Sequence, residues 1–224
     1  MSMFDPAAFL STLKSAVNAF QLRQVEAAIP KVPLRAEHVA NCRLLLNRQA
    51  LLHELPTRSV CAEIGVDQGD FTDAILRVAQ PSQLHLVDTW GSRRYNETKF
   101  EQVRNRFARE LQSGTVVIHR KLSLEAVSDF EDACFDWIYL DTTHAYELTA
   151  QELRAYAAKI KPGGLMCGHD YSMGNWIKAY RYGVIEAVHE FCVTDGWELV
   201  YLTLEPIECQ SFSIRRIAAP VRAS

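Results

Sequence analysis

The sequence lacks the features that would tie it to a membrane, to nucleic acid or to an oxidising compartment. No stretch approaches the roughly 20 apolar residues of a transmembrane helix, and the N-terminus shows no basic region followed by an apolar run. The 24 Lys and Arg and 27 Asp and Glu residues are dispersed and give a net charge of −3. We therefore expect no nucleic-acid partner and no membrane surface. The six cysteines form no CxxC pair, so we expect reduced thiols and a cytoplasmic location.

The first part of the chain predicts a helical extension. Asp5-Pro6 is typical of a helix start, and apolar residues follow at intervals of three or four as far as Phe20. A second helix is predicted over Ala36–Leu55, with leucines 44, 45, 51 and 52 as its apolar face. We expect residues 1–56 to cover the acceptor side of a main domain or to contact a second copy in a homo-oligomer. The main domain is then residues 57–224.

From Ser59 onward, apolar strand candidates alternate with helix-like segments. The strand candidates are SVCAEI, QLHLVD, TVVIH, FDWIYLD and GLMCGHD. This alternation predicts an α/β fold, in which a parallel sheet has helices on both faces. The last two candidates, WELVYLTL and QSFSIRRI, are joined by a short link with Pro206 and predict an antiparallel pair at the sheet edge. A ligand is expected at the carboxyl ends of the parallel strands.

The first strand of this domain runs into a turn with glycines at positions 65 and 69. The dinucleotide fingerprint G-x-G-x-x-G is absent, and Asp67 and Asp70 would repel a pyrophosphate at the start of the next helix. Asp88 ends the following strand, about 20 residues beyond the turn, where a carboxylate accepts hydrogen bonds from ribose hydroxyls. These residues favour an adenosine without phosphates.

The segments EIGVDQGDFT, LVD, FDWIYLDTTHAYE and IKPGGLMCGHDY resemble the class I S-adenosylmethionine-dependent methyltransferases, and most closely the macrocin-type O-methyltransferases. The resemblance covers roughly residues 59–217. It implies a Rossmann-like sheet of seven strands with the last strand antiparallel. By motif position it also implies that Glu63 and Gly65 lie near the methionine end of the cofactor, Gly69 at the turn and Asp88 on the ribose. Ser123 either reaches the adenine or caps a helix.

Ionisable residues follow the fourth and fifth strand candidates, where the chemistry is expected. Asp141 and His144 follow the fourth, and His169 and Asp170 follow the fifth. Neighbouring strand ends lie about 5 Å apart, so Asp141 and Asp170 can share a divalent cation that prefers oxygen ligands, such as Mg²⁺. A cation lowers the pKa of an acceptor hydroxyl, and His144 is the expected base.

His169 leaves the presence and the identity of the metal open, because related metal-dependent enzymes usually have a carboxylate at that position. An imidazole ligand favours a softer ion such as manganese or iron. His169 can instead face the core or form a local hydrogen bond.

The predicted function is methyl transfer to a hydroxyl of a small molecule such as a sugar or a natural product. Asp141-Thr142-Thr143-His144 differs from the Asn/Asp-Pro-Pro-aromatic sequence of many enzymes that methylate base amines, which again disfavours nucleic acid. Aromatic residues flank the site and can form a lid or an acceptor pocket, or can simply pack helices: Trp90, Tyr95, Trp176, Tyr180 and Tyr182. The alternatives are an NAD-type oxidoreductase and a catalytically silent protein that binds S-adenosylmethionine.

Overall fold

The structure, a computed structural model, describes residues 17, 20–175, 180–206 and 209–218. The chain is helical over 20–28. In the order of the chain, the elements that follow are η1 (Ala36–His38), β1 (Arg43–Leu45), α2 (Arg48–Glu54), β2 (Val60–Ile64), α3 (Asp70–Val78), β3 (Gln83–Val87), α4 (Glu97–Arg106), α5 (Ala108–Ser113), β4 (Val116–His119), α6 (Ser123–Ala126), η2 (Val127–Asp129), β5 (Phe135–Leu140), α7 (Tyr146–Ala157), β6 (Ile160–Gly168), β7 (Gly174–Asn175), β8 (Tyr180–Arg181), α8 (Val184–Asp195), β9 (Trp197–Thr203) and β10 (Phe212–Arg216).

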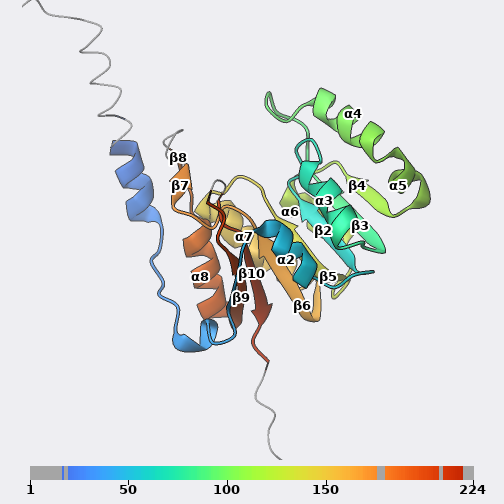
Figure 1. The fold of residues 1–224 in the computed structure, drawn as a ribbon. Helices are drawn as coiled ribbons and strands as arrows, with labels where there is room; N and C mark the ends of the chain where they lie inside the picture. The colour runs from blue at the N-terminus through green and yellow to red at the C-terminus, as the bar shows by residue number, and fades with distance from the viewer. Residues whose placement is uncertain (1–16, 18–19, 176–179, 207–208, 219–224) are drawn as a thin grey trace, which may run out of the picture.

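A mixed sheet with the strand order β1-β9-β10-β6-β5-β2-β3-β4 forms the centre of the molecule (Figure 1). Its strands are parallel except β10, which runs antiparallel to both β6 and β9. From β2 the chain builds outward through β3 and β4, and then returns to the other side of β2 with β5 and β6. This change of direction opens a crevice at the carboxyl ends of β2 and β5, which is where ligands bind in open α/β sheets.

The sheet has eight strands rather than the seven that were predicted. The additional strand is β1, which pairs in parallel with β9 and forms one edge. The predicted antiparallel pair, β9 and β10, is present. Its placement at the edge is wrong, because β10 lies between β6 and β9 and β1 covers the outer side of β9.

The predicted helix over Ala36–Leu55 is largely wrong, since only η1 and α2 are helical in this range. Asn47 caps α2, and its side chain accepts a hydrogen bond from the backbone N–H of Ala50 at 2.8 Å. The residue before the helix must therefore be extended, and Arg43–Leu45 can reach β9. The apolar residues of α2 that face inward, Leu51 and Leu52, are completely buried. The Asp5-Pro6 helix start lies outside the described residues.

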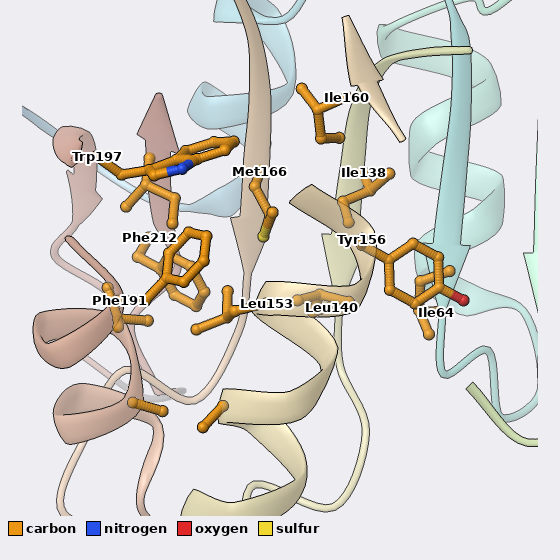
Figure 2. Packing of buried hydrophobic residues seen from close by; sticks show 14 of the residues in the cluster. Ile64, Ile138, Leu140, Leu153, Tyr156, Ile160, Met166, Phe191, Trp197 and Phe212 are labelled. Atoms are coloured by element: carbon orange, nitrogen blue, oxygen red, sulfur yellow. The ribbon is translucent and has the colours of Figure 1, made fainter. Parts of the chain in front are cut away.

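Each face of the sheet carries its own apolar core. Along β5, Ile138 and Leu140 point to the face covered by α6, α7 and α8, whereas Trp137 and Tyr139 point to the face covered by α2 and α3. Figure 2 shows part of the first core, to which α7 contributes Leu153 and the sheet contributes Met166. Helices on both faces confirm the predicted layers, and they leave the carboxyl ends of the strands for the site.

Candidate active site

A cleft of about 810 Å³ lies at the carboxyl ends of the parallel strands. Its walls come from the turns that follow β2, β3, β4, β5 and β6, together with the start of α2 and the hairpin β7–β8. Residues of the described chain that are far apart in sequence thus meet in one cavity. Of the predicted site residues, only Gly69 and His169 are not among those that line it.

The turn after β2 is shaped by glycine. Gly65 has φ +95°, and a Cβ atom there would lie 1.9 Å from the backbone oxygen of Asp141 at the end of β5. Gly69 has φ +82°, and a Cβ atom would lie 2.6 Å from the ring of Phe107. Both positions therefore need glycine, for conformation and for space. Asp67 has φ 53°, so an aspartate takes the left-handed conformation that a glycine often supplies in this loop.

The side chain of Asp88 is already engaged with the same turn. Its Oδ2 accepts hydrogen bonds from the backbone N–H groups of Val66 at 3.0 Å and Asp67 at 3.1 Å, and its Oδ1 accepts one from Trp90 at 3.0 Å. A carboxylate oxygen has two lone-pair sites, so Oδ1 keeps one for a ligand. Asp88 lines the cleft, and its contact with the ribose stays a prediction.

Glu63 is a buried carboxyl directly beneath the cleft. Its side chain accepts a hydrogen bond from the hydroxyl of Thr72 in α3 at 2.5 Å, and the residue is 1% exposed. Burial raises the pKa of Glu63 to about 8, because it disfavours the charged form. A ligand cation at this end of the cleft would favour the ionised form.

Ser123 is the first residue of α6 and lines the cleft. The residue at the cap position is Leu122, so the predicted capping role of the Ser123 side chain is wrong. The pKa of nearby Glu152 rises to about 7, because burial outweighs the hydrogen bonds with Ser123 and Thr142.

The two acidic residues of the turn are paired with cations of α4. Asp67 forms an ion pair with Lys99, and Asp70 forms one with Arg106 at 2.7 Å. These ion pairs reduce the repulsion that a phosphate would meet. The charge of the turn therefore does not by itself exclude a dinucleotide, contrary to the expectation from sequence.

Asp141, His144 and Asp170 form the densest group of ionisable side chains in the cleft. One ligand atom from each lies within 4.8 Å of the others, and Nδ1 of His144 is 3.0 Å from Oδ2 of Asp170. Burial raises the pKa of Asp141. For Asp170 burial also favours the neutral form, but the hydrogen bond with His169 and the charges of both histidines outweigh it, so its pKa is lowered.

His144 and Asp170 also have left-handed backbones, with φ 61° and 55°. Such conformations are uncommon outside glycine and gather at functional sites.

His169 faces the two carboxylates from the protein side. Its Nδ1 lies 3.3 Å from Asp170 Oδ2 and 3.7 Å from Asp141 Oδ2, while its Nε2 is buried without a hydrogen-bond partner. Burial lowers the pKa of His169, but the hydrogen bond with Asp170 and the two negative charges outweigh it, and the net pKa is raised. The local hydrogen bond that was left open from sequence is therefore present.

The aromatic residues divide into two groups. Trp90 is 1% exposed, donates from Nε1 to the backbone oxygen of Asp67 at 2.8 Å and packs against Phe100, so it belongs to the core. Tyr95, Tyr180 and Tyr182 line the cleft. The ring of Tyr182 lies 4.8 Å from that of His144. Trp176 lies outside the described residues.

Arg48 is a charged lining residue that sequence reasoning missed. It is the first residue of α2, in the segment that we expected to cover the acceptor side or to contact a second copy. The Asn47 cap could have indicated where this helix begins. No motif indicated that the side chain of Arg48 enters the cleft.

The comparisons with known proteins agree with this geometry. Residues 62–171 match a family model described as a methyltransferase domain. No curated protein matches the sequence. Among the helices in the described part of the chain, none has the length and apolar character needed to cross a membrane.

Solved structures share the fold at low identity. The 1,6-didemethyltoxoflavin-N1-methyltransferase of Burkholderia thailandensis, with bound S-adenosylhomocysteine, is 14% identical with a TM-score of 0.55, over 97% of this chain and 93% of that chain. The tRNA methyltransferase TrmK of B. subtilis is 14% identical with a TM-score of 0.54, over 77% and 67%. The pyocyanin biosynthetic protein PhzM is 15% identical with a TM-score of 0.56, over 74% of this chain and 54% of PhzM, so the chain spans about half of its length.

The polar residues that line the cleft also fit S-adenosylmethionine as a ligand. The turn at Gly65 is a cradle that a Cβ atom would fill, Glu63 can face an ammonium group, and Asp88 keeps one lone-pair site for a ribose hydroxyl. Together with the strand order, the methyltransferase domain matched over residues 62–171 supports an S-adenosylmethionine-dependent methyltransferase.

Proposed function

We propose that the protein transfers the methyl group of S-adenosylmethionine to a hydroxyl of a small molecule, of the sugar or natural-product type that macrocin-type O-methyltransferases modify. One observation carries the proposal. Asp141, His144 and Asp170 meet at the ends of β5 and β6, in the same cleft as the glycine turn. A hydroxyl acceptor needs a base beside it because it is a poor nucleophile until its proton is removed.

His144 is proposed as the base. With Nδ1 bonded to Asp170 Oδ2 at 3.0 Å, the neutral imidazole has its free lone pair on Nε2. In the reaction the acceptor oxygen forms a bond to the methyl carbon as the carbon–sulfur bond breaks. The hydroxyl proton passes to His144 Nε2, and S-adenosylhomocysteine leaves with the sulfur electron pair.

The same group of side chains fits a divalent cation such as Mg²⁺ or Mn²⁺. Ligands about 2.1 Å from one ion lie about 3–4 Å from each other, and the atoms of Asp141, His144 and Asp170 lie within 4.8 Å. We propose that Asp141 and Asp170 hold the cation, and that His169 supports the two carboxylates from behind. When bound, a cation lowers the pKa of a hydroxyl next to it.

The small size of the acceptor is supported by the walls of the cleft. Tyr95, Tyr180 and Tyr182 line it, and aromatic walls suit a compact organic molecule. The net charge of −3 offers no field for a polynucleotide. We place the reaction in the cytoplasm, as the sequence predicts.

The test uses Asp141→Asn and Asp170→Asn, with Asp136→Asn as a matched control at the opposite end of β5, where the carboxylate pairs with Lys161. Mn²⁺ binding is measured by isothermal titration without an acceptor. Methyl transfer to a panel of sugar and phenolic hydroxyls is measured with and without chelator. We expect both site variants to lose Mn²⁺ binding and at least about 100-fold in turnover. The affinity for S-adenosylhomocysteine should be unchanged in Asp170→Asn, and the control should behave as the wild type.

His144→Ala should slow transfer by about 10²–10⁴-fold, the usual contribution of a positioned base. Part of the rate should return at high pH, where the hydroxyl ionises unaided. Full activity after chelation, with no Mn²⁺ bound, would remove the cation and leave the histidine alone. Methylation of nitrogen acceptors and of no hydroxyl would overturn the proposed reaction.

A further inference from the structure

One cationic side chain enters the cleft from outside the matched methyltransferase segment. Arg48 begins α2, which packs beside α3 (Figure 1). Its backbone N–H donates to the carboxylate of Glu205 beyond β9. Its guanidinium carbon lies 4.8 Å from the ring centroid of Phe71, in the first turn of α3. Arg48 is therefore held by backbone and by side chain over the helix that follows the glycine turn.

The part of the cleft next to Arg48 is otherwise acidic. Burial raises the pKa of Glu63 and of Asp141, and the positive charge of Arg48 acts against that rise at both. Glu63 lies in β2 and Asp141 follows β5. The backbone of Gly65 passes between the ends of these two strands.

The other permanently cationic residues that line the cleft, within the described chain, lie toward its opposite end. Arg94 follows β3 and is exposed, and Lys121 follows β4 and pairs with Asp129 at 2.5 Å. That end also holds Asp88, where the ribose is predicted. Along the row of strand ends, Arg48 is thus the cation at the end away from the adenosine.

The methyl donor has a matching distribution of charge. Its adenosine is neutral, and its amino-acid end carries an ammonium and a carboxylate. With the ribose at the end of β3, the amino-acid end extends past β2 toward β5 and α2. Glu63 and Asp141 attract the ammonium there but repel the carboxylate, which therefore needs a cation of its own. A guanidinium suits this need because its paired N–H groups match a carboxylate.

We propose that Arg48 binds the carboxylate of the methionine half of S-adenosylmethionine, and keeps this contact in the product S-adenosylhomocysteine. The inference rests on donor binding and not on the acceptor or the metal. A failed search for a hydroxyl acceptor would therefore leave it standing.

The test removes the charge from the protein and from the ligand in turn. S-adenosylmethionine and its decarboxylated analogue, which keeps the ammonium but lacks the carboxylate, are titrated calorimetrically into four proteins. These are the wild type, Arg48→Ala, Arg48→Lys and the control Arg43→Ala. Arg43 lies in the same segment, near an aromatic ring at 5.6 Å and paired with Glu54, and it does not line the cleft. Circular dichroism checks the fold of each variant.

We expect the wild type to bind S-adenosylmethionine about 10- to 100-fold more tightly than the analogue, which is the range for a charge-assisted bidentate pair. Arg48→Ala should lose this preference, with weaker binding of S-adenosylmethionine and nearly unchanged binding of the analogue. Arg48→Lys should keep part of the preference for S-adenosylmethionine over the analogue, and Arg43→Ala should keep all of that preference.

Two outcomes would overturn the proposal. An equal loss for both ligands in Arg48→Ala would make Arg48 a structural residue of α2. An unchanged affinity for S-adenosylmethionine, together with a raised KM for an acceptor, would place Arg48 on the acceptor instead. If Arg48→Ala does not fold, the wild type and Arg48→Lys still decide, because a wild type with no preference between the two ligands rejects the proposal.

Discussion

The two ends of the cleft are built in different ways. At the donor end, the glycine turn follows β2 directly, and the Asp88 carboxylate accepts backbone hydrogen bonds from residues within about one βαβ unit. At the acceptor end, His144, Asp170 and Tyr182 come from separate connections. The glycine turn and the Asp88 side of the donor end are thus specified by a short contiguous sequence, and the acceptor end by the assembly of the whole fold.

The forces that hold the two ends differ as well. The donor turn is fixed by backbone conformation and close contact, which leave little freedom for substitution. The hairpin β7–β8 at the acceptor end is tied by side-chain ion pairs around Arg181, including one to Glu26 of the N-terminal helix. The pair with Glu26, whose carboxylate is exposed, is of the modest kind that is easily exchanged. Donor binding is therefore preorganised, whereas acceptor binding can change through residues distant in sequence.

The largest expected effect is at the donor end. Gly65→Ala would place a methyl group 1.9 Å from the Asp141 backbone oxygen at φ +95°, so β2 and β5 must separate at their ends. We expect a loss on the order of 3–5 kcal/mol in the free energy of unfolding, and no measurable binding of S-adenosylhomocysteine. Urea denaturation and isothermal titration measure these two quantities.

Gly114→Ala is the matched control, because Gly114 also has a positive φ of +77° but no atom within 4 Å of the added Cβ. It should cost only the left-handed strain of about 1–2 kcal/mol and leave ligand affinity unchanged. Similar losses in both variants would show that conformation, and not the contact with Asp141, makes glycine necessary at position 65.

The sequence predicted the central fold well because its signals are local. Apolar runs and turn residues identify β2 to β6 and the helices between them within short windows. The strand β1 has no such signal, since it has three residues of which only Leu45 is buried. It exists because β9, more than 150 residues later, offers an edge at Tyr201–Thr203. Such long-range pairing overrides local propensity.

The candidate site shows the same division. Gly65, Asp88 and Asp141 follow strands, so their meeting at one sheet edge could be expected. Arg48 and Tyr182 belong to no motif and reach the cleft only through tertiary packing. The partner of His144 was also unpredictable, because its bond to Asp170 depends on the left-handed backbone at both residues.

A second, intermediate effect concerns protons at the donor end. Burial raises the pKa of Glu63 to about 8, so at pH 7 most of the protein carries a neutral Glu63 before a ligand binds. The ammonium of S-adenosylmethionine favours the carboxylate, and binding should release close to one proton. Calorimetry at pH 7 in phosphate and in Tris measures this number. Glu63→Gln, or 5′-methylthioadenosine as a ligand without an ammonium, should abolish the release.

The same shift predicts how stability depends on pH without a ligand. The folded pKa of about 8 lies above the ordinary value of 4.5, so the unfolded chain loses this proton first. The contribution of Glu63 is fully present below about pH 4.5 and is lost as pH rises toward 8, with a total on the order of a few kcal/mol. Glu63→Gln should therefore flatten the decline of stability in this window. An identical decline in the variant would show that Glu63 is ionised in the folded protein.

The smallest expected effect is at the acceptor end, in the contacts that hold the hairpin β7–β8. Arg181 is largely buried and donates to the backbone oxygens of Met173 and Tyr182, so it connects the two strands. Its guanidinium also binds Glu26 Oε2 at 2.5 Å, while Lys31 joins Glu26 to Glu186 at 2.7 and 2.9 Å. The N-terminal helix thus restrains the hairpin whose Tyr182 packs on His144.

Glu26→Gln should weaken this restraint by about 0.2–1 kcal/mol, the range for an ion pair whose carboxylate lies at the surface, and leave Arg181 bound to Glu186. We expect amide exchange to become a few-fold faster at Tyr182, whose N–H donates to Met173 at 3.1 Å, and the acceptor KM to rise by a similar factor. The affinity for S-adenosylhomocysteine should not change, because the ion pair that is lost joins the N-terminal helix to the hairpin and not to the donor turn. Glu37→Gln is the control, since Glu37 lies in the same segment and pairs only with nearby residues among those described.

High salt should reduce the difference between the wild type and Glu26→Gln. A loss of donor affinity in Glu26→Gln would show instead that the two ends of the cleft are coupled and not held independently.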